Sequence, residues 1–244
     1  MLIGSSASAS NISGFYRTVG SIGVSYSSID IAGWGDDLME TMAGQGTLNF
    51  GQYQAMFSKQ DAAAGVALGI HDLMSAGGVY IASCVLGIGE APTIGAPAFS
   101  CDMNENSYSV ILGGDSAVAI QGDVTSTDTM EVYHWGQMLG VGTSVSATTS
   151  NGSLDNGASS SGGSIAVLHV TQSDGAMGSN DWEIKIEDST DDAAWSDLTT
   201  FTADGSQTIA EVGTSSGTVN RYTRATVTKT AGTDLIFWIN LVRL

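Results

Sequence analysis

Three histidines and two cysteines are the residues of this 244-residue chain best suited to metal binding or nucleophilic catalysis. His71, His134 and His169 form no H-x-H, H-E-x-x-H or Cys/His cluster, so we expect no zinc site. No G-x-S-x-G turn is present, and no serine or cysteine has a recognisable base partner. Cys84 and Cys101 are expected to be free thiols, with a disulfide between them as the alternative. The sequence therefore predicts that the protein is not an enzyme and holds no cofactor or metal.

Four carboxylates gather in the segment EDSTDDAAWSDL, namely Asp188, Asp191, Asp192 and Asp197. A calcium loop would use such oxygens, but the central glycine and terminal glutamate of an EF-hand are missing. A glycosidase pair would need a sugar platform and a pocket that raises the pKa of one carboxyl group. We expect instead a solvated turn in which aspartates accept hydrogen bonds from backbone amides.

Aromatic and basic residues offer two further kinds of binding site. The five tryptophans are Trp34, Trp135, Trp182, Trp195 and Trp238. They could stack on sugar rings, but the last three fall on or beside expected strands with alternating neighbours, which favours core packing. Arg221 and Arg224 are expected to form ion pairs with the aspartate cluster, within the domain or between subunits, rather than to bind phosphate.

Charge is the most unusual property of the composition. Seven basic residues face 25 acidic ones, which gives a net charge of −18. Residues 1–160 carry −12 of it and residues 161–244 carry −6. So few lysines and arginines argue against binding of nucleic acid through its phosphates. The longest nearly apolar run, 78–89, has 12 residues, short of the roughly 20 that span a bilayer, and residues 1–13 do not read as a signal peptide.

Glycine and proline usage indicates a mainly β protein. The 32 glycines and two prolines are typical of many short strands joined by tight turns. The first half is expected to contain one helix, 61–75, and strands at 22–31, 47–57, 79–88, 107–112, 117–124 and 129–139. The second half is expected to contain strands at 165–171, 182–187, 195–201, 208–212, 218–228 and 235–243. Residues 1–20 are small and polar enough for a flexible arm, and the Ser/Gly/Thr-rich segment 141–163 is expected to be a linker.

The loop from Gly33 to Gly46 carries three large apolar residues, Leu38, Met39 and Met42. Such side chains are out of place in a loop that meets only water. We expect them to dock on a neighbouring molecule.

The order of elements in residues 21–140 resembles the major tail tube protein of long, non-contractile tailed phages (the siphovirus type). The matching segments are IDIAGW (29–34), GTLNFGQYQ (46–54), DAAAGVALGIHDLM (61–74), YSVILGGDSAVAIQGDV (108–124) and TMEVYHWGQML (129–139). Residues 164–244, with EIKIEDSTDDAAWSDLTTF (183–201) and RYTRATV (221–227), are similar to β-sandwich domains appended to phage tail and capsid proteins.

The resemblance implies a fold of two parts, a tail-tube-type β-sandwich or barrel with one α-helix, followed by a small immunoglobulin-like β-sandwich. It implies a structural virion protein that forms stacked, hexameric rings around a channel, assembled in the host cytoplasm into the virion tail. The loop with Leu38, Met39 and Met42 would bridge to the next ring. The implied partners are copies of the chain itself, the tape-measure protein and tail terminator or distal tail proteins, with no membrane.

DNA would pass through this channel without specific binding, because an acidic wall repels phosphates. The candidate channel-lining acids are Asp30, Asp102, Glu105, Asp115, Asp123, Asp128 and Glu131. The alternative function is a capsid decoration protein or a carbohydrate-binding surface protein.

Overall fold

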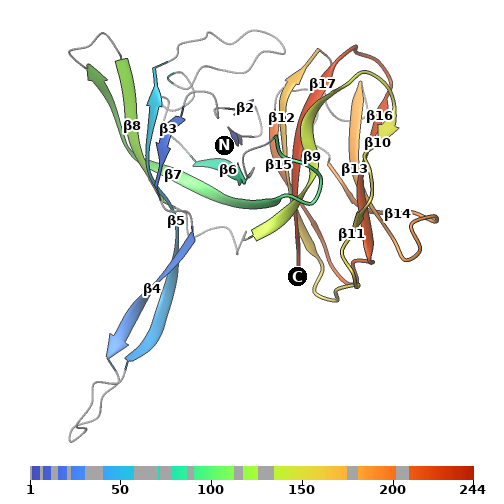
Figure 1. Cartoon of the computed structure of the whole chain (residues 1–244), viewed down its shortest axis with the longest axis horizontal. Helices are drawn as coiled ribbons and strands as arrows, with labels where there is room; N and C mark the ends of the chain where they lie inside the picture. The colour runs from blue at the N-terminus through green and yellow to red at the C-terminus, as the bar shows by residue number, and fades with distance from the viewer. Residues whose placement is uncertain are drawn as a thin grey trace, which may run out of the picture.

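The chain is mainly β, and its strands form two antiparallel sheets (Figure 1). The computed structural model describes residues 2–5, 8–11, 16–20, 23–30, 41–57, 71, 79–86, 91–112, 118–125, 135–174, 181–201 and 209–244. Within these residues one sheet has twelve strands and the other has five. The fold class expected from the sequence is thus confirmed.

The large sheet contains the N-terminal strands and half of the C-terminal ones. Its longest run of paired neighbours is β15-β12-β17-β9-β7-β6-β1-β2, and β3, β4, β5 and β8 branch from it. The strands before residue 130 are β1 (Leu2–Ser5), β2 (Ser8–Asn11), β3 (Tyr16–Val19), β4 (Gly23–Asp30), β5 (Thr41–Met56), β6 (Val79–Val85), β7 (Pro97–Leu112) and β8 (Val118–Thr125). The later strands of this sheet are β9 (Trp135–Val145), β12 (Ser164–Ser173), β15 (Ile209–Ser215) and β17 (Leu235–Arg243).

The small sheet covers one face of the C-terminal part of the large one. It consists of β10 (Thr149–Ser150), β11 (Leu154–Asp155), β13 (Trp182–Ser189), β14 (Ser196–Thr200) and β16 (Tyr222–Lys229). Strand β13 alternates as expected: Trp182, Ile184 and Ile186 are buried, and the charged residues between them are half-buried. Those three side chains pack in one core with Leu168 of β12 and Phe237 of β17. The C-terminal part is therefore a β-sandwich.

The segment 141–163 differs from the expected linker, because most of it belongs to the sandwich. Strand β9 continues to Val145, and β10 and β11 both pair with β16. At the start of the segment a small residue is needed because β17 fills the space beside it. Gly142 has a φ of +70° at a register shift next to the Val141↔Trp238 pair, and a Cβ there would clash with the indole ring of Trp238. The glycine that indicates a linker in the sequence is thus required by packing.

Residues 1–20 also differ from the expected flexible arm. Strand β1 pairs with β6, and β3 pairs with β5, so both strands belong to the large sheet. Leu2 and Ala9 are buried. Small side chains made this segment look like an arm, whereas its order comes from backbone hydrogen bonds, which side-chain patterns do not report.

The expected helix at 61–75 lies outside the described residues except for His71, which is helical. Its ring lies 4.8 Å from that of Phe57, and Nδ1 is hydrogen-bonded to the hydroxyl of Tyr108. In the part of the chain that the structure describes, no helix is long and apolar enough to cross a membrane.

A buried polar network joins the N-terminal and C-terminal parts of the large sheet. The Oγ of Ser83 is 2.9 Å from His169 Nε2 and 2.6 Å from Ser100 Oγ, and Asn240 Nδ2 donates to the same Ser100 oxygen. All four residues are buried. A serine next to a histidine suggests hydrolytic chemistry, but neither lines a pocket in the described residues. Burial lowers the pKa of His169 to about 3, so the imidazole is neutral near pH 7.

This network predicts that stability falls with acidification. The unfolded chain takes up a proton on His169 near pH 6.5, whereas the folded chain does so only at about pH 3. Unfolding is thus coupled to proton uptake between these values, and the free energy of unfolding declines by up to about 1.4 kcal/mol per pH unit from this residue. Urea unfolding is measured at pH 6.5, 6 and 5, which lie roughly in the upper part of this window and above most carboxyl pKa values. The free energy of unfolding should fall more steeply with decreasing pH for the wild type than for His169→Gln. Parallel curves would contradict the assignment.

Candidate assembly surfaces

A two-stranded ribbon projects from the large sheet. Strand β4 pairs with β5 from Gly23↔Asn49 to Asp30↔Thr41, whereas β3 and β8 pair with β5 only from Asn49 onward. Among the described residues, the ribbon therefore has no third strand, and Figure 1 shows it extending at the lower left. Eight residues of β4 span roughly 27 Å. An isolated two-stranded ribbon is only marginally stable in water.

The far end of the ribbon exposes apolar side chains. Ile29 and Met42 are direct cross-strand partners, and 45% and 52% of their surfaces are exposed. Tyr26, on the same strand as Ile29, is 65% exposed. Partners in antiparallel strands place their side chains on one face. The ribbon thus carries an apolar pair that no other described part of the chain covers.

Met42 was expected in the inter-ring loop, and the structure places it on β5 beside that loop. The strand begins at Thr41, so the expected loop 33–46 is shorter than predicted. Leu38 and Met39 lie outside the described residues. The pairing of Met42 with Ile29 adds a residue that the sequence analysis did not single out, although a β-branched residue in an expected strand is a usable signal.

A second exposed apolar surface lies where β5, β8 and β7 end side by side, at the upper left of Figure 1. Leu112 of β7 is the cross-strand partner of Val118 on β8, and Met56 of β5 is that of Ala119 on the other edge of β8. We call this surface the hairpin tip; its exposed members are Met56, Phe57, Val110, Ile111, Leu112 and Val118. Leu112 is 80% exposed. Clustered apolar exposure of this kind typically marks an interaction site.

The seven candidate channel acids have different environments. Asp102 is only 1% exposed, so its side chain faces the interior of the chain and cannot line a channel, contrary to expectation. Glu105 is half-buried and accepts a 2.7 Å hydrogen bond from Tyr53. Burial raises its pKa, and the Tyr53 bond opposes that shift. Asp123, on β8, is half-buried.

For the remaining acids the channel assignment stays a prediction. Asp30 ends β4 opposite Thr41. Asp115, Asp128 and Glu131 lie outside the described residues.

Asp191 holds a turn after β13 as expected, whereas Asp188 is a buried residue of β13 and not part of a solvated turn. Asp191 Oδ1 accepts hydrogen bonds from the amides of Ala193 and Ala194 and from Ser189 Oγ. These bonds, led by that of the Ala194 amide, lower the pKa of Asp191. Asp188 Oδ2 accepts the Asn220 amide. Both carboxylates thus accept hydrogen bonds from backbone amides, and no group of three His, Cys, Asp or Glu residues in the described part of the chain is arranged to hold a metal.

Both arginines form ion pairs within the sandwich, but not with the aspartate cluster. Arg221 binds both carboxylate oxygens of Asp155, at 2.7 and 2.6 Å. Arg224 Nη2 lies 2.7 Å from Glu187, and its guanidinium stacks 4.1 Å above the centre of Trp195. The prediction that both arginines form ion pairs is correct, but the predicted partners are wrong. For Arg224 the reason is the strand register, which brings Glu187 opposite it.

The two cysteines are free thiols. Cys84 faces Phe99, and Cys101 faces Ala82, so they lie two positions out of register on neighbouring strands. Burial raises the pKa of each thiol, which disfavours the reactive thiolate.

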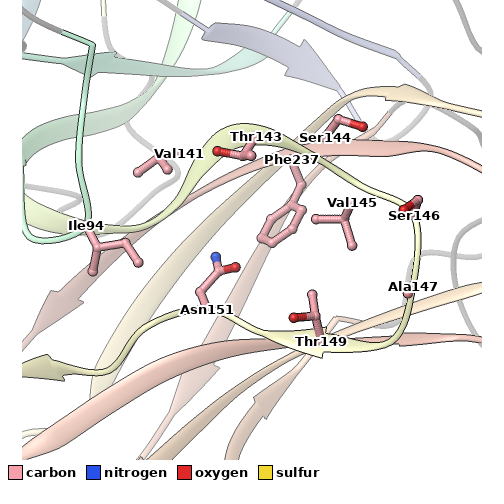
Figure 2. A pocket seen from close by; sticks show the side chains of 10 residues that line it. All are labelled: Ile94, Val141, Thr143, Ser144, Val145, Ser146, Ala147, Thr149, Asn151 and Phe237. Atoms are coloured by element: carbon pink, nitrogen blue, oxygen red, sulfur yellow. The ribbon is translucent and has the colours of Figure 1, made fainter.

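In the described part of the chain, one pocket lies at the open end of the sandwich, between β9 and the turn that leads to β10 (Figure 2). Its volume is about 420 Å³. Phe237, Val145 and Ile94 supply its apolar lining, and hydroxyl and amide side chains such as Thr149 and Asn151 complete it. None of the ten residues that Figure 2 labels is titratable. Its described lining thus offers no ionisable side chain that could act as a general acid or general base.

No protein-family model matches this chain, and none of the curated proteins does. Among solved structures, the Dit protein of phage SPP1, described as a paradigm of the hub adsorption apparatus in phages that infect Gram-positive bacteria, aligns over 99% of both chains at 10% identity. The TM-score is 0.24. A value this low does not establish a common fold, and the function of this chain has to rest on its own surfaces.

The ribbon predicts an assembly defect without a folding defect. Replacing the exposed pair by Ile29→Ser and Met42→Ser should leave the thermal unfolding of the lone chain nearly unchanged, because surface substitutions usually shift stability by less than about 0.5 kcal/mol. Association should weaken, since full burial of such a side chain contributes roughly 1.5–3 kcal/mol and about half of each surface remains to be buried. Sedimentation velocity across a concentration series measures the association of both the variant and the wild type.

Ser28→Ala, on the same strand, is the matched control and should associate like the wild type. If the double variant does so too, the ribbon is not an assembly surface.

Proposed function

We propose that this chain is a structural protein of a phage virion, a tail tube subunit that assembles with copies of itself into stacked hexameric rings around a DNA-conducting channel. The observation that carries the proposal is the ribbon of β4 and β5, which exposes Ile29 and Met42 and has no third strand in the described residues. A ribbon of this kind gains stability when a neighbouring molecule covers it.

The outer edge of β4 supports strand pairing between subunits. Monomeric proteins usually protect edge strands with lysine, proline or inward-pointing charge. Strand β4 reads GVSYSSID and has neither lysine nor proline. Its second edge has no partner strand among the described residues. Sheets joined edge to edge around a ring would satisfy its backbone groups.

We call strands β4, β5, β7 and β8 together the branch. The ribbon and the hairpin tip lie at its opposite ends, as Figure 1 shows. Two apolar surfaces that face away from each other suit a head-to-tail contact, in which one end of a subunit meets the other end of the next. Stacked rings repeat such a contact along the tube axis. The ribbon would then bridge to the adjacent ring.

Electron microscopy of the purified protein tests the proposal directly. Negative-stain images at high protein concentration should show rings or tubes, and sedimentation should show a species much larger than the 25.0 kDa chain. Isolated small particles at every concentration, with and without tail initiator complexes, would favour a decoration or surface protein instead.

The net charge of the first 160 residues predicts how DNA moves through the channel. Asp123, partly exposed on β8, is the described acid best placed to face it. Asp123→Lys, repeated around each ring, should leave tubes intact and slow DNA ejection, most strongly at low salt, where charges are least screened. The ejection rate is measured from the fluorescence of a dye that binds the released DNA.

Asp197→Lys makes the same charge change on the sandwich, where its ion pair with Lys185 is exposed and contributes little stability. This control should eject DNA at the wild-type rate. Equal rates for both variants would remove Asp123 from the channel wall.

A further inference from the structure

Trp135 differs from the other tryptophans that the structure describes, because about half of its surface is open to solvent. Trp182 is fully buried, Trp195 lies under Arg224, and Trp238 packs against Gly142. Trp135 is 48% exposed. One side of its ring is fixed by an edge contact with Phe99, whose centroid is 5.3 Å away at an interplanar angle of 61°. An exposed indole alone proves little, so its surroundings decide what it can do.

The exposed indole lies on the rim of a pocket of about 330 Å³. Gln137, two residues along β9, is exposed on the same face of the strand. Asp155 lies at the end of β11, Asn156 directly follows it, and Arg243 lies at the end of β17. Four polar side chains from three separate parts of the chain thus converge beside one aromatic ring.

Three of these polar groups are held in place by bonds outside the pocket. Asp155 is gripped at both oxygens by Arg221. Asn156 donates from Nδ2 to Arg221 O at 2.9 Å and to Thr223 Oγ1 at 3.1 Å, so its carbonyl oxygen is oriented as an acceptor. Arg243 donates from Nη2 to the Ala158 carbonyl at 2.6 Å and to that of Val219 at 3.2 Å. Fixed groups lose little entropy when a ligand binds.

We propose that this pocket binds a hexopyranose ring. The face of an aromatic ring is electron-rich and attracts the C–H groups on the apolar side of a sugar. The hydroxyl groups at the sugar's edge both donate and accept, which matches a carboxylate and an amide oxygen beside amide and guanidinium donors. The volume is near the lower end of the roughly 300–1,000 Å³ of ligand pockets, so one ring fits.

The pocket's charge admits a neutral or an acidic sugar. Asp155 is neutralised by Arg221, and Arg243 adds a guanidinium that burial shifts to a lower pKa but that stays protonated at pH 7. The site lies where β9 passes from the sandwich to β7, far along the sheet from the ribbon. It therefore shares no residue with the ribbon or the hairpin tip.

Saturation-transfer difference NMR on the full chain tests the proposal. The probes are the methyl glycosides of glucose, galactose and N-acetylglucosamine for the neutral arm, and methyl glucuronide for the acidic arm. At least one probe should receive saturation and bind in the millimolar range, and the arm that binds more tightly identifies the class of sugar. Absence of transfer to all four probes overturns the proposal.

Variants locate the site. Trp135→Ala should weaken binding by about tenfold, equivalent to about 1.4 kcal/mol. Gln137→Ala, which removes an exposed side chain and leaves the Phe99 contact intact, should weaken it by a smaller factor. Tyr26→Ala is the matched control, because it removes an exposed aromatic ring from the distant ribbon, and it should bind like the wild type. Wild-type affinity in both pocket variants, or an equal loss in Tyr26→Ala, places the sugar elsewhere and overturns the proposal.

Discussion

Strand β9 pairs with β7 through Trp135, Gly136 and Gln137 and with β17 through Gln137 to Val145, so one strand joins the two parts of the chain. Only three residue pairs connect β9 to β7. The buried bonds among Ser83, Ser100, His169 and Asn240 lie at the same junction and reinforce it. Polar residues are tolerated there because each forms a hydrogen bond. Since buried hydrogen bonds form only in a defined geometry, these bonds fix how the two parts of the chain are oriented. Loss of this junction would leave a sandwich and a separate, poorly supported branch of strands.

The two parts have opposite relations to solvent. The sandwich buries its large side chains, Trp182 and Phe237 among them, and binds its surface charges in pairs such as Arg224 and Glu187. The branch formed by β4, β5, β7 and β8 leaves Ile29, Met42 and Leu112 in water. A protein selected to act alone would rarely keep apolar residues at both ends of one branch. The sandwich thus holds most of the large buried side chains, and the branch holds exposed apolar ones.

Side-chain periodicity allowed the strands with one buried face to be predicted. Strands β13 and β17 fall within a few residues of their expected bounds, because Trp182, Ile184 and Ile186 alternate and Leu235–Arg243 is apolar apart from Asn240 and its last residue. Strands of small residues escaped prediction: β1 is held by its backbone, and the end of β9 is glycine-rich because Trp238 fills the space beside Gly142. For the site, Met42 was recognisable as an apolar residue in a polar setting and Ile29 as a β-branched residue in an expected strand. Their pairing and the burial of Asp102 depend on register and on the facing sheet, which a single sequence does not contain.

The continuous run of strands from the ribbon to the sandwich has a mechanical consequence. A pull along β5 is directed along its strand axis, so the hydrogen bonds between β5 and β8 from Asn49 to Met56 would share the load instead of breaking one after another. The next ladder, from β8 to β7, is similarly long, whereas the contact of β7 with β9 comprises three pairs. Under tension the β5–β8–β7 strands would keep their register and pass the load to this junction. There the three pairs are supported by backbone hydrogen bonds of Met138 with Gly95 and Ala96 and by the buried side-chain bonds described above. The resistance of the junction to a pull would therefore depend on buried side chains as well as on its strand ladder.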